Sequence, residues 1–412
     1  MNNVITKISA EDILDSRGNP TLKVTVATSA GQASFSVPSG ASTGKYEAHE
    51  LRDNDKNIFN GLGVKKAVES VNEVISPALV GKDASEQNEI DRILIELDGT
   101  PNKEKLGGNA LIGTSVACAK TAATSKGVEV FEHLRSLAEI KPSQNIPFLF
   151  MNLINGGKHA SSRLAFQEYH VVPQTENIAQ ALDVATDIQR TLKELLVKEL
   201  GPEAANLGDE GGFAPDLTDT ARPLELMAEA LKINNAESSV KLALDTAASS
   251  FFDDNDKTYL VNDKRLSFQE LKNYYHDLIA KFPIMSIEDP FEENDFNGFA
   301  ELLSANAGLF VVGDDLTVTN NLRLKTAMEN KSINAIIIKP NQIGTLTETL
   351  STMRLARENG IECIVSHRSG ETEDDFIADL AFAFGCFGLK AGAPQRGERV
   401  VKYNRLKHIA SL

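Results

Sequence analysis

The sequence lacks most of the features that mark secreted, disulfide-rich and membrane-spanning proteins. Its 412 residues include only three cysteines, Cys118, Cys363 and Cys386, which are far apart and lie in apolar surroundings. This spacing fits reduced thiols in a protein core better than disulfides or a zinc site. No uninterrupted apolar run approaches the ~18 residues of a membrane-spanning helix, so no membrane span is expected.

A secretory signal and an excess of positive charge are also missing. The first residues, MNNVITKISAEDILDS, have no basic start followed by an apolar block, and we therefore expect a cytoplasmic protein. The chain has 42 lysines and arginines against 58 acidic residues, a formal net charge of -16. This charge repels phosphate backbones, so nucleic acid is not expected as the main partner. For an anionic small molecule we expect a locally basic pocket.

The second part of the chain, from Pro147 onward, contains eight short apolar segments separated by helix-like segments. Such segments are typical of buried strands in a mostly parallel sheet. The expected strands are residues 148–154, 166–172, 241–245, 284–288, 309–314, 335–339, 363–367 and 387–390. Eight strands can close a barrel. The first two are too close together for a crossover helix, which predicts an antiparallel start and an irregular barrel.

The first part of the chain has a different pattern. Residues 21–26 and 33–37 alternate apolar and polar side chains on either side of a turn, which predicts an antiparallel hairpin. Helical patterns follow at residues 63–78, 85–97 and 109–126. We therefore predict an α/β protein. A small α+β amino-terminal domain (1–137) precedes an irregular eight-stranded (β/α) TIM-type barrel (138–412).

Six of the expected strands stop at an ionisable residue: Asp245, Glu288, Asp314, Lys339, His367 with Arg368, and Lys390. Because parallel strands end at one face of a barrel, these side chains should meet where barrel enzymes have their active sites. Three converging carboxylates repel one another unless a cation lies between them. Oxygen ligands without a Cys or His cluster favour Mg²⁺. The alternative is that each acid caps the following helix.

Two of these strand ends suggest catalytic and binding chemistry. Lys339 precedes Pro340, which keeps it extended at the barrel mouth. Beside bound cations its neutral amine is favoured, which suits a general base; alternatively, it only neutralises surrounding acids. Arg368 and Ser369 precede a helix that we expect to start around Glu371. A guanidinium and a hydroxyl at a helix N-terminus can bind phosphate.

Three glycine-rich segments have the composition of loops. Residues 38–44 have the small side chains of a movable lid but lack the Gly-Lys-Ser/Thr ending of a nucleotide-binding loop. Residues 155–159 and 208–212 are flexible loops that carry ionisable groups, among them His159 and Glu210. Each loop alone is weak evidence for a site.

Nine motifs together resemble those of the enolases, the phosphopyruvate hydratases of glycolysis, and they cover nearly the whole chain. They are ILDSRGNPT (13–21), VPSGASTG (37–44), NGGKHA (155–160), LGDEGGFAP (207–215), SIEDP (286–290), GDDLTVTN (313–320), IKPNQIGT (338–345), SHRSGETED (366–374) and KAGAP (390–394). The resemblance implies a lyase with two Mg²⁺ ions per active site that reversibly dehydrates 2-phosphoglycerate to phosphoenolpyruvate. It also implies a homodimer or a higher homo-oligomer.

The resemblance also assigns roles to individual residues. The first Mg²⁺ is implied to bind Asp245, Glu288 and Asp314, and the second Ser42. The implied catalytic residues are Lys339 as the base and Glu210 as the acid, with Glu168, His159 and His367. The implied substrate-binding residues are Arg368 and Ser369 for the phosphate, Lys390 on the carboxylate side, and Gln167, His159 and His367 for polar contacts.

The sequence also departs from the family pattern and leaves two other functions open. Ser250 stands where the family commonly has glutamate, and residues 252–266 look shortened. One alternative function is that of a dehydratase or racemase of the wider superfamily, which acts on an unphosphorylated acid and does not need Arg368 and Ser369. The other is a binding or scaffolding role without catalysis.

Overall fold

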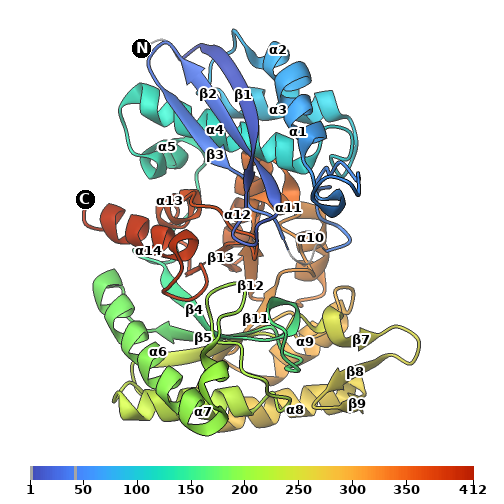
Figure 1. The fold of residues 1–412 in the computed structure, drawn as a ribbon, viewed down its shortest axis with the longest axis vertical. Coiled ribbons are helices and arrows are strands. Elements are labelled where there is room, and N and C mark those ends of the chain that lie inside the picture. The colour runs from blue at the N-terminus through green and yellow to red at the C-terminus, as the bar shows by residue number, and fades with distance from the viewer. Residues whose placement is uncertain (1–2, 41–43) are drawn as a thin grey trace.

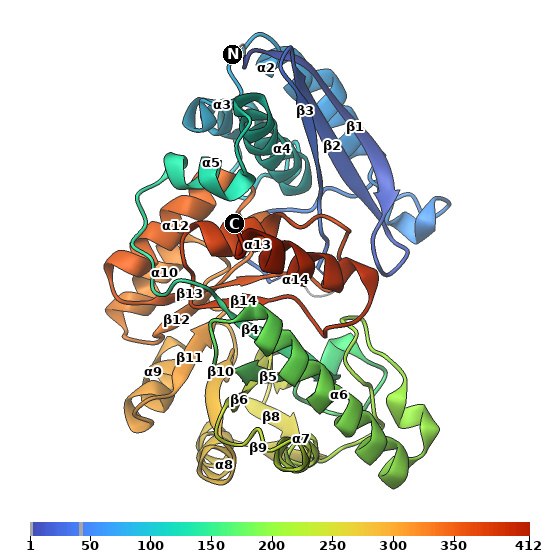
Figure 2. The same cartoon turned by 90° about the vertical axis from the view of Figure 1, so that its left-hand side faces the viewer.

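The computed structural model describes residues 3–40 and 44–412. These residues form a three-stranded antiparallel sheet, a closed eight-stranded barrel and a second, smaller three-stranded sheet. The first sheet and its helices lie together at one end of the molecule, beside the barrel (Figures 1 and 2). The predicted fold class, an irregular TIM-type barrel preceded by a small α+β region, is confirmed.

The amino-terminal sheet has the order β1 (Ile5–Leu14), β2 (Pro20–Thr28) and β3 (Gln32–Ser36), with both pairs antiparallel. The expected hairpin is the pair of β2 and β3. Strand β1 was missed, because its exposed and buried residues do not alternate regularly. A sequence pattern of period two cannot reveal such a strand.

Helices cover one face of this sheet. Residues 65–79 form a continuous helical stretch made of α1 (Lys65–Glu69), a π-helical segment (Ser70–Ile75) and α2 (Ser76–Leu79). They are followed by α3 (Gln87–Asp98), α4 (Gly108–Lys126) and α5 (Val130–Leu137). Helix α4 packs on β2 and β3 so closely that a Cβ at Gly113 would lie 2.7 Å from Val24 Cγ2. Small residues make this approach possible.

The barrel contains all eight expected strands. They are β4 (Phe148–Asn155), β5 (Glu168–Pro173), β6 (Val240–Asp245), β10 (Ile284–Glu288), β11 (Phe310–Gly313), β12 (Ala335–Ile338), β13 (Glu362–Ser366) and β14 (Gly388–Lys390). The barrel closes through β14 and β4, and β5 is antiparallel to both β4 and β6. The other pairs are parallel. The predicted antiparallel start is confirmed.

Two apolar clusters stabilise the barrel. A small cluster, which includes Phe150, Val172, Val312 and Ile337, is formed by residues from strands around the barrel. Side chains alternate between the two faces of a strand, so every second residue points into the barrel, and these residues form the small cluster. The residues that alternate with them point outward and pack against the helices. The larger cluster lies between the strands and the surrounding helices and continues into the amino-terminal part.

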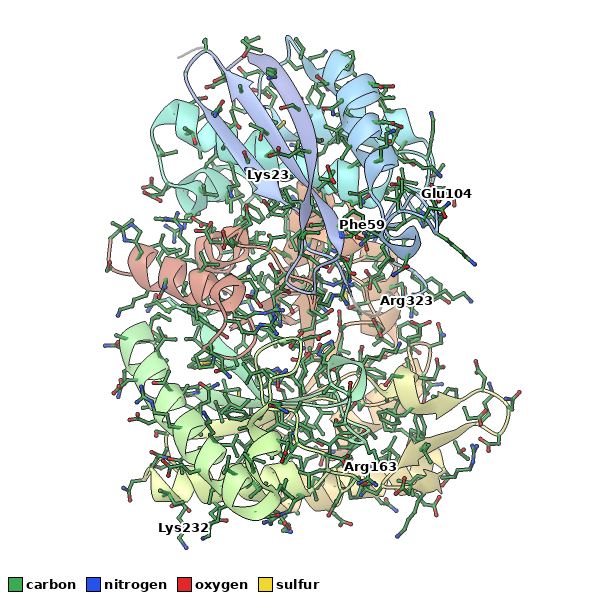
Figure 3. All side chains as sticks on the ribbon, viewed as in Figure 1. Lys23, Phe59, Glu104, Arg163, Lys232 and Arg323 are labelled. Carbon is green, nitrogen blue, oxygen red and sulfur yellow. The ribbon has the colours of Figure 1, made fainter. Side chains whose placement is uncertain are left out.

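Most of the helices that surround the barrel connect its strands, and α14 follows the last strand. They are α6 (Ile178–Leu200), α7 (Arg222–Ile233), α8 (Phe268–Lys281), α9 (Phe296–Ala305), α10 (Asn321–Glu329), α11 (Pro340–Ile343), α12 (Leu346–Glu358), α13 (Phe376–Ala383) and α14 (Gly397–Ile409). The segment that looked shortened forms the small sheet of β7 (Phe252–Asp253), β8 (Thr258–Val261) and β9 (Lys264–Leu266). Charged side chains such as Lys232 and Glu104 lie on the outside (Figure 3). No helix in residues 3–40 and 44–412 is long and apolar enough to cross a membrane.

Candidate active site

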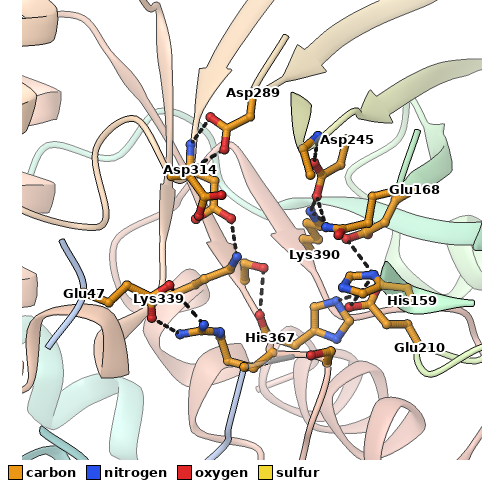
Figure 4. A pocket seen from close by; sticks show the side chains of 17 residues that line it. Glu47, His159, Glu168, Glu210, Asp245, Asp289, Asp314, Lys339, His367 and Lys390 are labelled. Atoms are coloured by element: carbon orange, nitrogen blue, oxygen red, sulfur yellow. Dashed lines mark hydrogen bonds and ion pairs between the residues drawn. The ribbon is translucent and has the colours of Figure 1, made fainter. Parts of the chain in front are cut away.

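A pocket lies at the carboxyl ends of the barrel strands, where residues of the amino-terminal part approach them (Figure 4). It is lined by Gly40, Glu47, His159, Gln167, Glu168, Glu210, Asp245, Ala247, Asp289, Asp314, Asp315, Lys339, Ser366, His367, Arg368, Ser369 and Lys390. Backbone hydrogen bonds between Ser39 and Gly370 join the two parts of the chain beside the pocket.

The ionisable strand ends come together as expected. Strands β6, β10 and β14 end at Asp245, Glu288 and Lys390. The residues that directly follow β11, β12 and β13 are Asp314, Lys339 and His367. All of them are in the pocket lining except Glu288, which contacts the pocket residue Lys390.

Lys390 is a buried cation surrounded by carboxylates. Its Nζ lies 2.9 Å from Asp245 Oδ2, 2.9 Å from both Glu288 oxygens and 3.2 Å from Glu168 Oε1. Burial alone would lower the pKa of Lys390, but these three carboxylates raise it well above its usual value. Lys390 is therefore charged, and it neutralises part of the acidic cluster.

Lys339 has a different partner. Its ammonium group forms an ion pair with Asp314, whose other oxygen accepts a hydrogen bond from Gln342 at 2.9 Å. Burial favours the neutral amine, but the carboxylate of Asp314 outweighs it and raises the pKa of Lys339. The expected neutral amine is therefore absent from this arrangement, because Asp314 carries a full charge next to it.

The carboxylates of the pocket outnumber its cations. Seven acids line it, against Lys339, Arg368 and Lys390. The expectation of a locally basic pocket is therefore wrong for the described residues. A surplus of oxygen donors at close range fits a divalent cation, which would relieve their mutual repulsion.

The donor atoms group in a way that the sequence did not reveal. Asp289, Asp314 and Asp315 offer carboxylate oxygens that lie within 4.8 Å of one another. Asp245 and Glu288 instead meet at Lys390, so the expected ligands Asp245, Glu288 and Asp314 do not share one point here. The capping alternative applies only in part, because Asp245 Oδ1 accepts a hydrogen bond from the amide of Ala247 while Oδ2 faces Lys390.

Asp289 and Asp315 were not recognised as candidates. Asp289 accepts hydrogen bonds from the amides of Asp314 (2.9 Å) and Asp315 (2.7 Å), so it shapes the turn after β11. Burial and then Asp314 raise the pKa of Asp315 to about 7. The adjacent acids in SIEDP and GDD were a sequence signal for both residues, but the expected strands ended at the first acid of each pair.

Glu168 and Glu210 form an acid pair with His159 between them. His159 Nδ1 lies 3.5 Å from an oxygen of each glutamate, and all three side chains are buried. Burial and the charge of Glu210 raise the pKa of Glu168 well above its usual value. Burial also acts to raise the pKa of Glu210, but His159 and His367 outweigh it and lower that pKa well below its usual value. Of the two acids, Glu168 is therefore the one that binds a proton more readily.

Two further side chains support this pair and were missed in the sequence. Asn152 Nδ2 donates to Glu210 Oε2 at 3.0 Å, and His170 Nε2 lies 2.9 Å from Glu168 Oε2. Burial and Lys390 lower the pKa of His170 to about 3, so its ring is neutral. Both residues lie within apolar strand sequences, where a polar residue is hard to distinguish from one that only completes the core.

Arg368 lies deep in the pocket and binds a carboxylate. Its guanidinium contacts Glu47 at 2.9 and 3.2 Å and also donates to Asn341 at 3.0 Å. Glu47 was not recognised, although it follows the predicted lid closely in sequence. In this structure Glu47 is therefore the carboxylate partner of the guanidinium.

The prediction of a helix that starts around Glu371 is wrong. The helix α13 begins at Phe376, and residues 371–375 are not helical. Glu371 is buried and pairs with Lys402 at 2.7 Å, while Asp374 accepts a hydrogen bond from the amide of Phe376. Any phosphate at Arg368 and Ser369 would therefore rely on their side chains and loop amides, not on a helix N-terminus.

Two expected site residues remain. Gln167 lines the pocket, and its Nε2 lies 3.4 Å from Asp245 Oδ2. Ser42, the expected ligand of a second Mg²⁺, lies outside the described residues. Ser369 is buried in the pocket wall beside Arg368.

Comparison with known proteins gives a consistent result over the whole chain. The family model described as the enolase C-terminal TIM barrel domain matches residues 143–411, and the enolase N-terminal domain model matches residues 5–134. The boundaries predicted from the sequence, 1–137 and 138–412, stay a prediction.

Named relatives match at similar lengths. A protein named enolase from Methanocaldococcus jannaschii is 47% identical over 407 residues, which cover 98% of this chain and 94% of that protein. An enolase from Methanopyrus kandleri is 46% identical over 410 residues, 98% of this chain and 95% of that protein. Enolase B from Dictyostelium discoideum is 44% identical and covers 98% and 94% of the two chains. With both family models and relatives of this identity, the chain belongs to the enolase family.

Proposed function

We propose that this chain interconverts 2-phosphoglycerate and phosphoenolpyruvate plus water in the pocket at the barrel strand ends. The observation that carries the proposal is that Lys339, Arg368 and the acid pair Glu168 and Glu210 line one pocket with a surplus of carboxylates. A base, an oxyanion-binding group, a proton donor and cation ligands are the parts that this dehydration needs.

Mg²⁺ is the cation that fits these donors. The residues proposed to hold it are Asp245, Glu288 and Asp314, and Ser42 is proposed for a second ion. All but Ser42 offer carboxylate oxygens, which Mg²⁺ prefers, and none of these four residues is a Cys or His. When bound, Mg²⁺ supplies positive charge that stabilises the electrons that accumulate on the substrate carboxylate.

Lys339 is proposed as the base. Its Nζ takes the proton from carbon 2 of 2-phosphoglycerate, and the electron pair of that C–H bond moves toward the carboxylate. The ion pair with Asp314 keeps the amine protonated in the described structure, so Lys339 must first lose its proton. A cation bound at Asp314 would lower the pKa of Lys339, because the charge of Asp314 is the main cause that raises it.

Glu210 and Glu168 are proposed to supply the proton for the departing hydroxide. The carbon 3–oxygen bond breaks, the carbon–carbon double bond forms, and the hydroxide leaves as water with this proton. The raised pKa of Glu168 favours it as the residue that stores the proton, and His159 contacts both glutamates. The role of Glu210 as the acid stays a prediction. We add Glu168 as the residue that is proposed to supply the proton together with it.

The remaining residues are proposed to bind the anionic groups of the substrate. Arg368 and Ser369 hold the phosphate, Lys390 lies on the carboxylate side, and Gln167 and His367 make polar contacts. The contact between Glu47 and Arg368 supports this assignment. Both oxygens of the Glu47 carboxylate accept from the guanidinium, and two oxygens of a phosphate could accept from it in the same way. A homodimer or larger homo-oligomer in the cytoplasm is also proposed, and light scattering of the purified protein tests the assembly.

The test is the absorbance of phosphoenolpyruvate formed from 2-phosphoglycerate. We expect turnover with Mg²⁺, its loss when a chelator is added, and its return when Mg²⁺ is restored in excess. Absence of turnover under all conditions would refute the proposed function. Equal turnover of a 2-hydroxy acid without phosphate would instead favour a dehydratase of the wider superfamily, because such a substrate does not need Arg368.

A further inference from the structure

Arg399 is a fully buried arginine that does not line the pocket but contacts three residues that do. It lies on α14, and none of its side chain is exposed. Its Nη1 lies 2.6 Å from His367 Nδ1 and donates to the Arg368 carbonyl at 2.7 Å. Its Nη2 donates to the Ser369 carbonyl at 2.7 Å and to the Asp209 carbonyl at 3.0 Å. One guanidinium thus joins the loop after β13 to the loop that carries Glu210.

The contact with His367 fixes the position of a proton. A guanidinium has five N–H donors and no acceptor, so the His367 nitrogen that faces it must be the acceptor. A neutral imidazole has one donor and one acceptor nitrogen, which leaves the proton on Nε2. If both nitrogens of His367 carried a proton, the Nδ1–H would point at the N–H of Arg399 Nη1 only 2.6 Å away, and the two donors would repel each other.

We propose that Arg399 is a positioning residue that holds His367 in the Nε2–H tautomer, so that His367 only donates hydrogen bonds on the pocket side. The inference rests on the proposed function for its consequence: His367 does not accept a proton during the reaction. Its Nε2 lies 3.4 Å from Glu210 Oε2, which is long for a hydrogen bond. The Nε2–H can therefore donate to a substrate oxygen instead.

The electrostatic surroundings agree with this geometry. Burial lowers the pKa of His367 to about 3; Glu210 acts in the opposite direction, and Arg399 lowers it further. A permanent positive charge behind the ring disfavours a second one on the ring. His367 is therefore neutral over the range in which an ordinary histidine titrates.

The fold leaves space for this contact at Gly392. Gly392 has φ +82°, and a Cβ there would lie 3.0 Å from Arg399 Cδ and 3.2 Å from His367 Cε1. Its carbonyl accepts a hydrogen bond from the Tyr403 hydroxyl at 2.6 Å, which ties the turn to α14. A side chain at Gly392 would clash with the Glu210 carbonyl oxygen, 2.7 Å from that Cβ, and would crowd Arg399 and His367.

The direct test is the ¹⁵N spectrum of histidine-labelled full-length protein, recorded with Mg²⁺ and without substrate. The chain has seven histidines, and the His367 signals are identified as those lost in His367→Gln. We expect Nε2 to be protonated and Nδ1 unprotonated, unchanged from about pH 6 to pH 8, where free imidazole titrates. A proton on Nδ1, or on both nitrogens, would overturn the proposal. This result does not depend on turnover, so it is independent of the proposed function.

A pair of variants then tests whether Arg399 causes this state. Arg399→Met should let His367 populate the Nδ1–H form or titrate near neutral pH, with a fall in kcat of about 10–100-fold, as misplacement of a reacting group can produce. Arg399→Lys, which keeps a donor, should restore part of the Nε2–H signal.

Lys402→Met is the matched control. Lys402 is a buried cation three residues further along α14, but it pairs with Glu371 at 2.7 Å, not with His367. We expect a similar loss of thermal stability in Lys402→Met and an unchanged His367 spectrum. If Arg399→Met leaves the His367 spectrum unchanged, or if Lys402→Met shifts it equally, Arg399 does not set the tautomer.

Discussion

The two sides of the pocket treat charge in opposite ways. On one side, Lys339 and Lys390 are buried cations in direct contact with Asp314, Asp245 and Glu288, and the carboxylates raise both lysine pKa values. On the other side, burial lowers the pKa of both His159 and His367. The two sides meet where Lys390 lies beside Glu168, next to His159 (Figure 4).

This difference indicates a division of work. The lysine side holds charged groups, and these stay charged because each lies within about 3 Å of an opposite charge. Charged groups can attract and orient ions. The histidine side holds histidines with lowered pKa values and a glutamate pair whose two pKa values are shifted in opposite directions. A side with such shifted pKa values suits proton transfer, whereas a side with paired charges suits binding.

The largest expected effect tests whether Lys339 acts as the base of the reaction or only neutralises the charge of Asp314. Lys339→Ala should lower kcat by about 10²–10⁴-fold, the usual contribution of a general base. Lys339→Arg keeps the positive charge beside Asp314, but a guanidinium does not act as a base. Both variants should be inactive in the phosphoenolpyruvate absorbance assay. Activity retained in Lys339→Arg would mean that the residue only neutralises Asp314.

A smaller effect is expected for the oxyanion site. Arg368→Lys keeps the charge but loses the two-pronged contact, so the KM for 2-phosphoglycerate should rise about 10–100-fold, from a loss of about 1.5–3 kcal/mol. The value of kcat should change less. Arg52→Lys is the control, because Arg52 binds Ser39 and backbone carbonyls but does not line the pocket. An equal rise in KM for both variants would place the phosphate elsewhere.

The smallest effect concerns stability on the histidine side. His170 has a pKa of about 3 in the folded chain and of about 6.5 when unfolded, so the unfolded state binds more protons in acid. Its contribution is fully present above about pH 6.5 and is lost as the pH falls toward 3. Between pH 7 and pH 5 the free energy of unfolding should therefore fall by about 2 kcal/mol more in the wild type than in His170→Gln.

Urea unfolding at the two pH values measures this difference. His133, outside the pocket, has a pKa lowered to about 4 by burial and then by Lys126, so His133→Gln should show a similar difference. Parallel pH curves for the wild type and His170→Gln would mean that the pKa of His170 is the same in the folded and the unfolded chain. The contrast between the two sides of the pocket would then disappear.

Sequence patterns were sufficient for the barrel strands and their charged ends. Segments such as 335–338, AIII, are apolar on both faces because the strands are covered on both faces, and this composition is visible in one sequence. The position of Lys339 at the barrel mouth could be predicted from the strand that it follows. The positions of Asp245 and Glu288 could be predicted from the strands that they end. The motif resemblance then supplied the loop residues, including Glu210 and His159.

Residues whose roles depend on distant segments could not be predicted. Glu47 reaches Arg368 across 321 positions of sequence, and Arg399 reaches His367 across 32. The first turn of α13 was misplaced because the acids after Arg368 suit a helix start, whereas Glu371 is taken by Lys402. The raised pKa of Lys339 depends on its ion pair with Asp314, which has no signature in the local sequence.

The reversed direction of β5 has a consequence for how the enzyme tolerates change in length. Because β5 starts at the catalytic face, the connection from β4 to β5 has both ends fixed there, and it carries His159 and Gln167. The connection that leaves β5 after Pro173 lies at the opposite face of the barrel. Insertions near residues 174–177 should therefore spare the chemistry, whereas insertions of the same length between residues 156 and 167 should displace it.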